Sequence, residues 1–250
     1  MENFTNQAAT IEIAFIHREE QLPSDFSYPA MPDNLNSRLC KKWQGQRAAH
    51  FLLTELFKKY GLDLTLLQNI ARTESGRPFV YSDHIDFNIS HSGDWIAVIF
   101  CYSFTKLAVG VDIEHPQRIR RYRDLIRHYA NIEEQQVLLA ENCSLLNNLA
   151  ERFYLSWCLR EAILKSQGVG IVKLSEVTHL PLTKQIFSAH CPSGKLHFIS
   201  KLPFYLSYFY QQPQNMLLSE PQLWRWQAGK FQPIHCQSII YDVNLRTTNA

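Results

Sequence analysis

The sequence predicts an α+β protein made of two similar lobes, because the same order of elements occurs twice along its 250 residues. In each half, helical patterns come first and strand-like runs follow. Short polar links join successive strand-like runs, which favours antiparallel sheets with helices packed on them. No residue-level repeat between the halves is visible. We therefore expect a pseudo-dimer of lobes 1–115 and 116–250, divided near His115-Pro116, with a binding site in the cleft between the lobes.

In the first half, alternating apolar residues predict a strand at residues 10–17, and three prolines predict a loop over the next twenty residues. Residues 34–60 have helical spacing, and Gly61 lies where the helix would end. Residues 75–78 predict a turn. We expect an antiparallel meander from the strand-like runs at residues 79–81 leading to 85–89, then 95–102, then 107–113.

The second half begins with a predicted helix at residues 118–129. Asn131 is expected to cap the next helix, with Glu134 three residues on. A long helix is expected from about residue 145 to 167, where Gly168 ends it. The strand candidates that follow are residues 176–180, 185–190, 196–201, 204–210 and 223–226.

The composition is that of a soluble globular protein, with 46% hydrophobic and 19% charged residues. A net charge of +2 gives no argument for nucleic-acid binding. No window approaches the roughly 18 apolar residues of a membrane span, and the N-terminal residues do not resemble a secretory signal. The six cysteines are scattered without paired spacing, which predicts buried reduced thiols, no zinc site and a cytoplasmic protein.

Two short stretches carry the strongest chemical signal. Asp112 and Glu114 lie two residues apart at the end of an apolar strand, so both side chains point to the same side of the sheet. Trp157, Glu161 and Lys165 recur every four residues and share one face of the long helix. If this face meets the strand end, three carboxylates and one ammonium converge. Oxygen ligands of this kind suit Mg²⁺, so the pattern predicts a phosphate-handling metal site.

Each half of this pattern also has a structural interpretation. The two acids could lie at a solvated strand edge, and Glu161 and Lys165 could form a salt bridge on an exposed helix face. Trp157 on the same stripe argues against a wholly exposed face. The neighbouring stripe predicts the core-facing side of the helix and consists of Leu155, Leu159, Ala162 and Ile163.

Three further groups are candidates for anion binding. Ser90 and His91 fall within residues 87–93, which we expect to form a tight turn whose N–H groups could hold an anion. Ordinary hairpin chemistry is the alternative for this segment. Arg77, and Arg47 with two lysines nearby, could bind phosphate or could be surface charges.

Five arginines against one acid form a basic cluster that would suit an acidic partner or a solvated helix. They are Arg118, Arg120, Arg121, Arg123 and Arg127, with Asp124 as the acid.

These motifs, in this order, resemble those of the 4′-phosphopantetheinyl transferases of the two-lobed, surfactin-synthetase-activating type. Residues 76–78 are similar to the family's Gly-Lys-Pro turn, and residues 87–92 to its Phe-Asn-Ile-Ser-His-Ser. Residues 110–114 match Gly-(Val/Ile)-Asp-Ile-Glu, and residues 157–165 match Trp-x-x-Lys-Glu-Ala-x-x-Lys. The resemblance runs from about residue 38 to 170, and the last eighty residues add little to it.

The resemblance implies transfer of phosphopantetheine from coenzyme A to a serine of an apo acyl or peptidyl carrier protein, with Mg²⁺ as the cofactor. Asp112, Glu114 and Glu161 would hold Mg²⁺ on the pyrophosphate. Lys165 would neutralise and protonate the leaving phosphate of 3′,5′-ADP. Glu161 or a metal-coordinated water would take the proton of the serine.

The same resemblance assigns Ser90 and His91 to the 3′-phosphate or the pyrophosphate, and Arg47 and Arg77 to the nucleotide phosphates. Two residues depart from the family's pattern. Arg77 replaces a lysine but keeps the charge and can form two hydrogen bonds to a phosphate. Arg160 replaces the first lysine of the helix motif and should face away from the stripe of Trp157.

The expected partners are therefore coenzyme A and a carrier protein, without nucleic acid or membrane, and with the chain acting as a monomer. Two alternatives remain open. A Mg²⁺-dependent nuclease would need a basic groove, with its catalytic Glu and Lys closer together on a strand. A non-catalytic or narrow-specificity module that binds coenzyme A or the carrier protein would differ only in the absence of efficient transfer.

Overall fold

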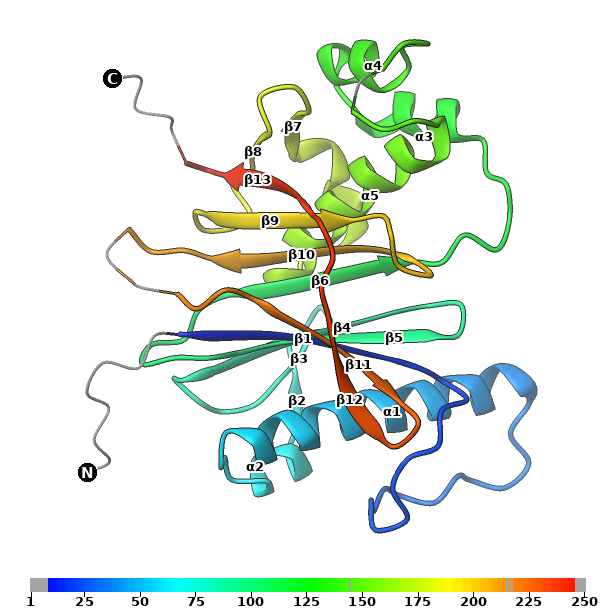
Figure 1. Cartoon of the computed structure of the whole chain (residues 1–250), viewed down its shortest axis with the longest axis vertical. Helices are drawn as coiled ribbons and strands as arrows, with labels where there is room; N and C mark the ends of the chain where they lie inside the picture. The colour runs from blue at the N-terminus through cyan, green and yellow to red at the C-terminus, as the bar shows by residue number, and fades with distance from the viewer. Residues whose placement is uncertain (1–8, 144, 215, 217, 246–250) are drawn as a thin grey trace.

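The computed structural model describes residues 9–143, 145–214, 216 and 218–245. Two large sheets lie edge to edge in Figure 1, with helices gathered at the two ends of the molecule. The first sheet contains β1 (Thr10–His17), β4 (Ile85–Ser92), β5 (Trp95–Tyr102), β11 (Gln222–Gln227) and β12 (Lys230–Ile234). The second contains β6 (Val109–Glu114), β7 (Thr178–Leu180), β8 (Gln185–Phe187), β9 (Gly194–Ile199), β10 (Tyr205–Gln211) and β13 (Ile239–Val243).

The helices are α1 (Ser37–Lys59), α2 (Thr65–Gln68), α3 (Tyr122–Tyr129), α4 (Ile132–Leu138), α5 (Leu149–Ser166) and the 3₁₀ helix η1 (Ile171–Glu176). A small sheet pairs β2 (Ala71–Arg72) with β3 (Pro78–Phe79). Most strand pairs are antiparallel, and β1–β11 and β8–β13 are parallel. The predicted α+β class with antiparallel sheets is confirmed.

Three hydrophobic cores hold these elements together, and each follows from the alternation of side chains along the strands. The first lies between α1 and one face of the first sheet, and includes Phe51, Phe57 and Phe100. The second includes residues of both sheets, such as Ile13 and Val111. The third lies between α5 and the second sheet. All four residues predicted for the core-facing stripe of α5 are fully buried within this third core.

Asparagine side chains cap the N-termini of α5 and α4. Asn148 accepts a hydrogen bond from the Glu151 amide, so α5 begins a few residues after the predicted start. Asn131 accepts from the Glu134 amide, as predicted for α4. Helix α3 begins only at Tyr122, although the sequence predicts its start at 118. Arginines before Tyr122 place positive charge at a helix N-terminus, which the helix dipole disfavours.

The predicted meander is wrong at its third strand. Strand β6 leaves the hairpin β4–β5 and pairs antiparallel with β10 of the second sheet. In the opposite direction, β11 and β12 return to the first sheet, where β11 pairs with β1. The division into lobes 1–115 and 116–250 stays a prediction, and the two sheets exchange strands across it.

The C-terminal part of the chain connects the sheets. In Figure 1 it runs from the hairpin β11–β12 beside α1 up to β13, which lies between β9 and β8. Strands β12 and β13 are not predicted from the sequence. Pro233 lies in β12, the edge strand of the first sheet. Proline is tolerated in an edge strand because one side of the strand has no neighbour to which an N–H would donate.

No helix in the described ranges is long and apolar enough to cross a membrane. All six cysteines are unpaired, as expected from their spacing, but the expectation that all are buried is wrong. Only Cys101 and Cys158 are buried, because these two lie in a central strand and on the core side of α5, whereas the other four are partly exposed.

Candidate active site

The side chains of β4 join the two sheets. Three backbone N–H groups of β6 donate to them: Val109 to Asp86, Val111 to Asn88 and Ile113 to Ser90, at 3.0, 3.1 and 3.2 Å. The His115 amide continues the series by donating to Ser92 at 3.0 Å. The backbone of β6 therefore forms hydrogen bonds along both edges, with the backbone of β10 on one side and with polar side chains of β4 on the other.

This arrangement corrects the expectation of a tight turn at residues 87–93. Residues 85–92 form an extended strand, and the turn to β5 is confined to Gly93 and Asp94. Ser90 is buried and holds β6, whereas the resemblance assigned it to coenzyme A. The period-two spacing of Asp86, Asn88, Ser90 and Ser92 was the available signal for a polar strand face.

Helix α5 approaches β6 closely because β6 has a glycine at the contact. A Cβ on Gly110 would lie 2.0 Å from the carbonyl oxygen of Ala162, so any other residue would push the helix away. The close approach brings the last turns of α5 over Asp112. The helix face predicted to meet the strand end does meet it.

Lys165 and Asp112 form the centre of the site. The Lys165 Nζ donates to Asp112 Oδ1 at 2.5 Å and to Ser90 Oγ at 3.1 Å. The Ser90 hydroxyl donates to the same carboxylate oxygen at 3.1 Å. Glu161, one turn before Lys165, lies 3.7 Å from the ammonium. One ammonium thus contacts two carboxyl groups.

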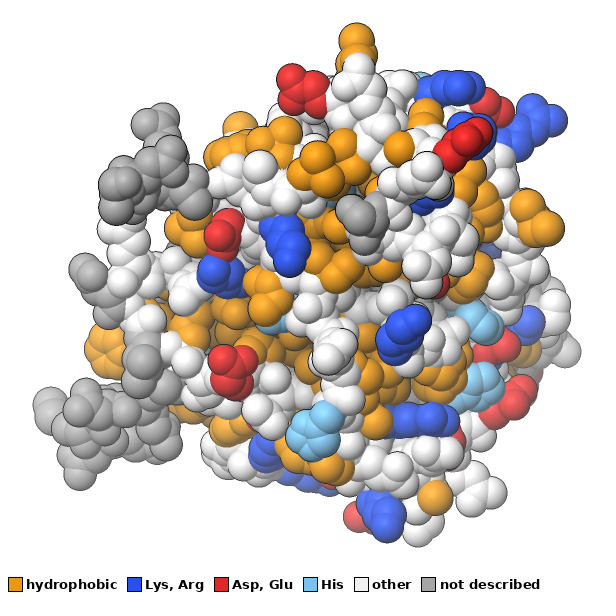
Figure 2. All heavy atoms as spheres, turned by 45° about the horizontal axis from the view of Figure 1, so that its top comes forward, with side chains coloured by type: hydrophobic (Ala, Val, Ile, Leu, Met, Phe, Trp, Pro, Cys, Tyr) orange, Lys and Arg blue, Asp and Glu red, His pale blue; other side chains and the backbone are white. Residues whose placement is uncertain are grey.

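Glu114 forms the outer edge of the site. Its carboxylate accepts a hydrogen bond from Ser92 at 3.1 Å and lies 3.6 Å from the guanidinium of Arg120. Arg120 belongs to the predicted basic cluster, whose five arginines are all exposed. In Figure 2, Lys and Arg side chains gather at the upper right, with Asp and Glu among them, over the end of the molecule that carries α3 and α4.

The carboxyl groups of the site influence one another. Burial, followed by the charge of Asp112, raises the pKa of Glu161 to about 7. The same two causes raise the pKa of Glu114. Burial disfavours the charge of Lys165, but Asp112 and Glu161 outweigh it and raise the pKa of the ammonium. The site holds more negative charge than Lys165 can neutralise.

These features fit a divalent cation. Three carboxyl groups supply the oxygen ligands that Mg²⁺ prefers, and the buried Oδ2 of Asp112 accepts no hydrogen bond from the described residues. The Cys158 thiol adjoins this carboxylate, and burial raises its pKa, so it remains protonated. In the part of the chain that the structure describes, no three His, Cys, Asp or Glu side chains are already arranged to hold an ion.

A groove of about 1460 Å³ extends from Lys165 along α1. Its walls come from α1, the loop at residues 25–29, the turn at residues 75–78, strand β4 and the end of α5. The charged side chains along it are Lys42, Lys58, Arg72, Arg77, Lys165 and Asp25, so cations predominate. A ligand carrying several phosphates would find complementary charge there.

The remaining predicted phosphate binders differ in their position relative to the groove. His91 is exposed and lines the groove. Arg77 also lines it, but its guanidinium is mostly buried and donates to Asp86 at 2.7 Å and to the Lys165 carbonyl at 3.1 Å. Arg77 therefore joins β4 to α5. Arg47 is absent from the groove wall, and its guanidinium lies 5.8 Å from the ring centres of Phe26 and Trp43.

The groove wall on α1 includes two residues, Gln46 and His50, that were not predicted from the sequence. Lys42, Gln46 and His50 line the groove, whereas Arg47 lies on another face of the helix. They recur every four residues, so helical spacing could have identified this face. Lys42 was noticed only as a neighbour of Arg47.

Arg160 faces away from the site, as expected, and has a structural role. Its guanidinium is buried, donates to Glu134 at 2.9 Å and lies with its centre 4.8 Å from the Tyr129 ring centre. His179 contacts the same carboxylate at 2.7 Å. Burial acts against the charge, yet Arg160 and His179 lower the pKa of Glu134 to about 2. Glu134 thus contributes its amide to the cap of α4 and its side chain to the core.

The chain is similar in sequence to known proteins. The profile of the 4′-phosphopantetheinyl transferase superfamily matches residues 108–231. A Haemophilus influenzae protein provisionally named a 4′-phosphopantetheinyl transferase is 42% identical over 233 residues, which cover 90% of this chain and 93% of that protein. A Thraustochytrium phosphopantetheinyl transferase is 34% identical over 41% of this chain and 38% of its own length. The 4′-phosphopantetheinyl transferase Sfp of Bacillus subtilis is 26% identical over 53% of this chain and 58% of its own length.

Proposed function

Because this chain belongs to the 4′-phosphopantetheinyl transferase superfamily, we propose that it moves 4′-phosphopantetheine from coenzyme A to a serine hydroxyl of an apo carrier protein. The serine oxygen would form a bond to the phosphorus next to the pantetheine. The pyrophosphate bond to the adenosine side would break, and 3′,5′-ADP would leave. The observation that carries the proposal is the contact of Lys165 with Asp112 and Glu161 at the end of the cationic groove.

The groove would receive coenzyme A. Its phosphates would lie toward the cationic lining, which includes Lys42, Arg72 and Lys165. His91 is exposed on the wall and can reach a bound ligand. Arg77 would have a positioning role, because its contacts hold β4 against the end of α5.

Lys165 would stabilise the leaving group, and Glu161 would act as the general base. The ammonium of Lys165 would donate a hydrogen bond to the leaving phosphate and neutralise the charge that develops on it. Glu161 has a carboxyl group with a pKa of about 7 and would accept the proton of the attacking serine. Asp112 holds the ammonium in position through its 2.5 Å contact.

Asp112, Glu114 and Glu161 would hold Mg²⁺, the cofactor that the family resemblance implies. When bound, Mg²⁺ would neutralise the negative charge of the pyrophosphate. The surplus of carboxyl groups over the Lys165 ammonium supports this assignment.

The exposed arginine cluster would receive the carrier protein. Arg120 lies beside Glu114 at the edge of the site, so a partner that contacts the cluster is also close to the reacting groups. An acidic carrier would have the complementary charge. Action as a monomer, without nucleic acid, remains our expectation.

The test is a mass measurement on carrier proteins. The purified chain is incubated with coenzyme A, Mg²⁺ and separate apo carriers from fatty-acid, polyketide and peptide synthesis. Intact-protein mass spectrometry should show phosphopantetheine added to at least one of them. Lys165→Met and Asp112→Asn should each slow the addition about 10²–10³-fold while the far-UV circular dichroism stays unchanged.

Two results would contradict the proposal. Transfer near the wild-type rate in both variants would remove Lys165 and Asp112 from the chemistry. Coenzyme A binding by calorimetry without transfer to any carrier would favour the non-catalytic binding module.

A further inference from the structure

The C-terminal hairpin β11–β12 extends past the end of β1. Strand β11 pairs parallel with β1, and Trp226 lies opposite Ile16, one residue before β1 ends. The hairpin turns at Ala228 and Gly229, whose φ angles of +50° and +77° fit a tight two-residue turn. Because β1 and β11 run in the same direction, this turn lies beside the segment that follows β1.

The segment at residues 18–36, which we call the connecting loop, leads from β1 to α1 without a helix or strand. Two hydrogen bonds join it to the hairpin. The indole N–H of Trp226 donates to the Gln21 carbonyl at 3.2 Å, and the Ala228 amide donates to the Glu20 carboxylate at 3.3 Å. Among the described residues, the bond from Trp226 is the one hydrogen bond that ties residues 21–34 to another element.

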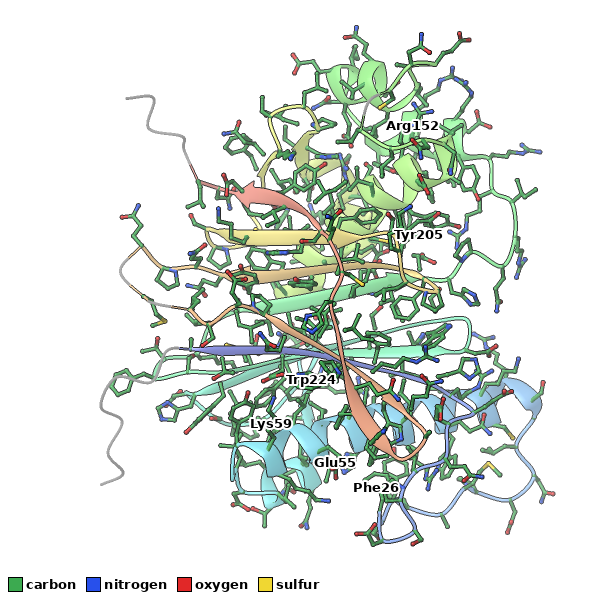
Figure 3. The ribbon with its side chains drawn as sticks, in the orientation of Figure 1. Phe26, Glu55, Lys59, Arg152, Tyr205 and Trp224 are labelled. Carbon is green, nitrogen blue, oxygen red and sulfur yellow. The ribbon has the colours of Figure 1, made fainter. Side chains whose placement is uncertain are left out.

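Trp226 also supports the connecting loop through ring contacts. It is 4% exposed, and its ring centre lies 4.7 Å from that of Phe51 on α1. Phe51 contacts Phe26 of the connecting loop edge to face, at 5.1 Å between ring centres. Phe26 stacks on Tyr28 at 6.4 Å, and Tyr28 lies 5.3 Å from His50. In Figure 3, Phe26 lies near the turn of the hairpin.

These ring contacts end in the groove. Residues 25–29, which include Phe26 and Tyr28, form one of its walls, and His50 lines it from α1. Burial raises the pKa of Tyr28 and lowers the pKa of His50, so both rings are uncharged at neutral pH. No residue of the hairpin, which is described throughout, lines the groove. The hairpin can therefore act on a bound ligand only through the connecting loop.

We propose that the hairpin β11–β12 is a positioning element for coenzyme A, because it holds the connecting loop where Phe26 and Tyr28 complete the groove wall. This inference rests on the proposed function, which assigns coenzyme A to the groove. Trp226 and Glu20 are positioning residues that do not touch the ligand. When the loop leaves its place in part of the molecules, the apparent affinity falls with the fraction that can bind, whereas the reacting groups stay in place.

The test combines proteolysis of the full chain with binding of coenzyme A. The double variant Trp226→Phe with Glu20→Ala removes both hydrogen bonds to the loop and keeps a ring against Phe51. Chymotrypsin should cleave the native variant after Phe26 about tenfold faster or more, because the loop opens more often. The Kd of coenzyme A, measured by calorimetry with Mg²⁺, should rise about fivefold. At saturating coenzyme A, kcat should stay within about twofold of wild type.

Trp224→Phe is the matched control, because it removes an indole donor from the same strand whose partner is Glu12 of β1 and not the connecting loop. It should leave the cleavage after Phe26 and the Kd unchanged. Equal acceleration of cleavage in this control overturns the proposal, since general loss of stability would then explain the effect.

Three further results separate this inference from the proposed function. Unchanged cleavage in the double variant overturns the inference, and so does faster cleavage with an unchanged Kd, because the ligand would then not use this wall. A lower kcat with an unchanged Kd overturns it as well. A wild-type chain that binds no coenzyme A contradicts the proposed function and, with it, the role in binding, whereas the cleavage measurement does not depend on any ligand.

Discussion

His197 on β9 is a histidine that its surroundings keep neutral. It stacks on Tyr208 with the ring centres 4.7 Å apart, and its Nδ1 lies 3.0 Å from the Ser238 hydroxyl. Burial, followed by the charge of Lys195, lowers the pKa of His197 from 6.5 to about 4. In the unfolded chain His197 binds a proton below pH 6.5, whereas in the folded chain it does so only below about 4. The contribution of His197 to the free energy of unfolding is therefore fully present above pH 6.5 and is lost as the pH falls from 6.5 to 4.

His197→Phe should reduce the acid sensitivity of the fold. Between pH 7 and pH 5, the free energy of unfolding of the wild type should fall by about 2 kcal/mol more than that of the variant. Urea unfolding at the two pH values measures this difference. Equal losses in both proteins would show that His197 titrates normally in the folded state.

Gly110 is the residue on which the approach of α5 to β6 depends. Gly110→Ala should lower the free energy of unfolding by about 1–3 kcal/mol and also slow transfer, because the new Cβ displaces the helix that carries Glu161 and Lys165. Denaturant unfolding and the carrier mass assay measure the two effects. Gly170→Ala is the stability control, since a Cβ there would meet nothing within 4 Å. Wild-type stability in Gly110→Ala would mean that α5 can shift without loss.

At the scale of elements, α3 and the segment before it carry two arginines whose charge pairs with no acid among the described residues. Arg121 and Arg123 are exposed, and no salt bridge of either residue occurs among the described side chains. Helix α3 packs on α5 through the buried Ile126 and Tyr129, so its outer face remains available to a partner. This face is where we expect an acidic carrier protein to bind.

Reversing both charges, Arg121→Glu with Arg123→Glu, should raise the KM for the carrier about tenfold at low salt and leave the affinity for coenzyme A unchanged. The effect should shrink as salt screens the charges. Lys184→Glu with Lys230→Glu makes the same change in net charge at exposed sites on other elements. An unchanged KM at low ionic strength would discard the docking role of α3.

At the scale of the whole molecule, the chain crosses between the sheets more than once. Strand β6 brings the second sheet against β4, and the C-terminal segment goes from the first sheet back to the second. Strand β13 lies inside the second sheet, where Tyr241 and Val243 are fully buried. The second sheet therefore depends on the last residues that the structure describes.

A chain that stops after residue 238 should be strongly destabilised. It loses two buried side chains and exposes the edges of β8 and β9, which should cost about 4 kcal/mol or more and lower the Tm by roughly 10 °C. Differential scanning calorimetry measures this change. A chain that stops after residue 245 is the control, since it keeps all of β13. Equal Tm values for the two truncations would show that β13 contributes little.

Much of the local structure could be predicted from the sequence, because it depends on neighbours in the chain. Asn131 and Glu134 signalled the start of α4, and Gly168, with φ of +69°, ended α5 within a residue of the prediction. The spacing of Glu161 and Lys165 correctly placed both on one face of α5, where one ammonium joins the carboxyl groups. Pairing between distant segments was less accessible. The sequence of β6 is apolar on the face that enters the core between the sheets, and this pattern does not reveal whether β5 or β10 is the partner strand.

The sequence by itself determined the α+β class, the type of most elements and the residues that meet at the candidate active site. These properties depend on periodicity, caps and the chemistry of side chains, which a local pattern contains. Only the tertiary structure decided that Arg77 holds β4 to α5, that Arg47 lies away from the groove, and that Trp224 of β11 donates a hydrogen bond to the buried Glu12. The physical reason is that a buried polar group takes whichever partner the packing brings within hydrogen-bond distance, and that partner can be more than two hundred residues away, as Trp224 is from Glu12.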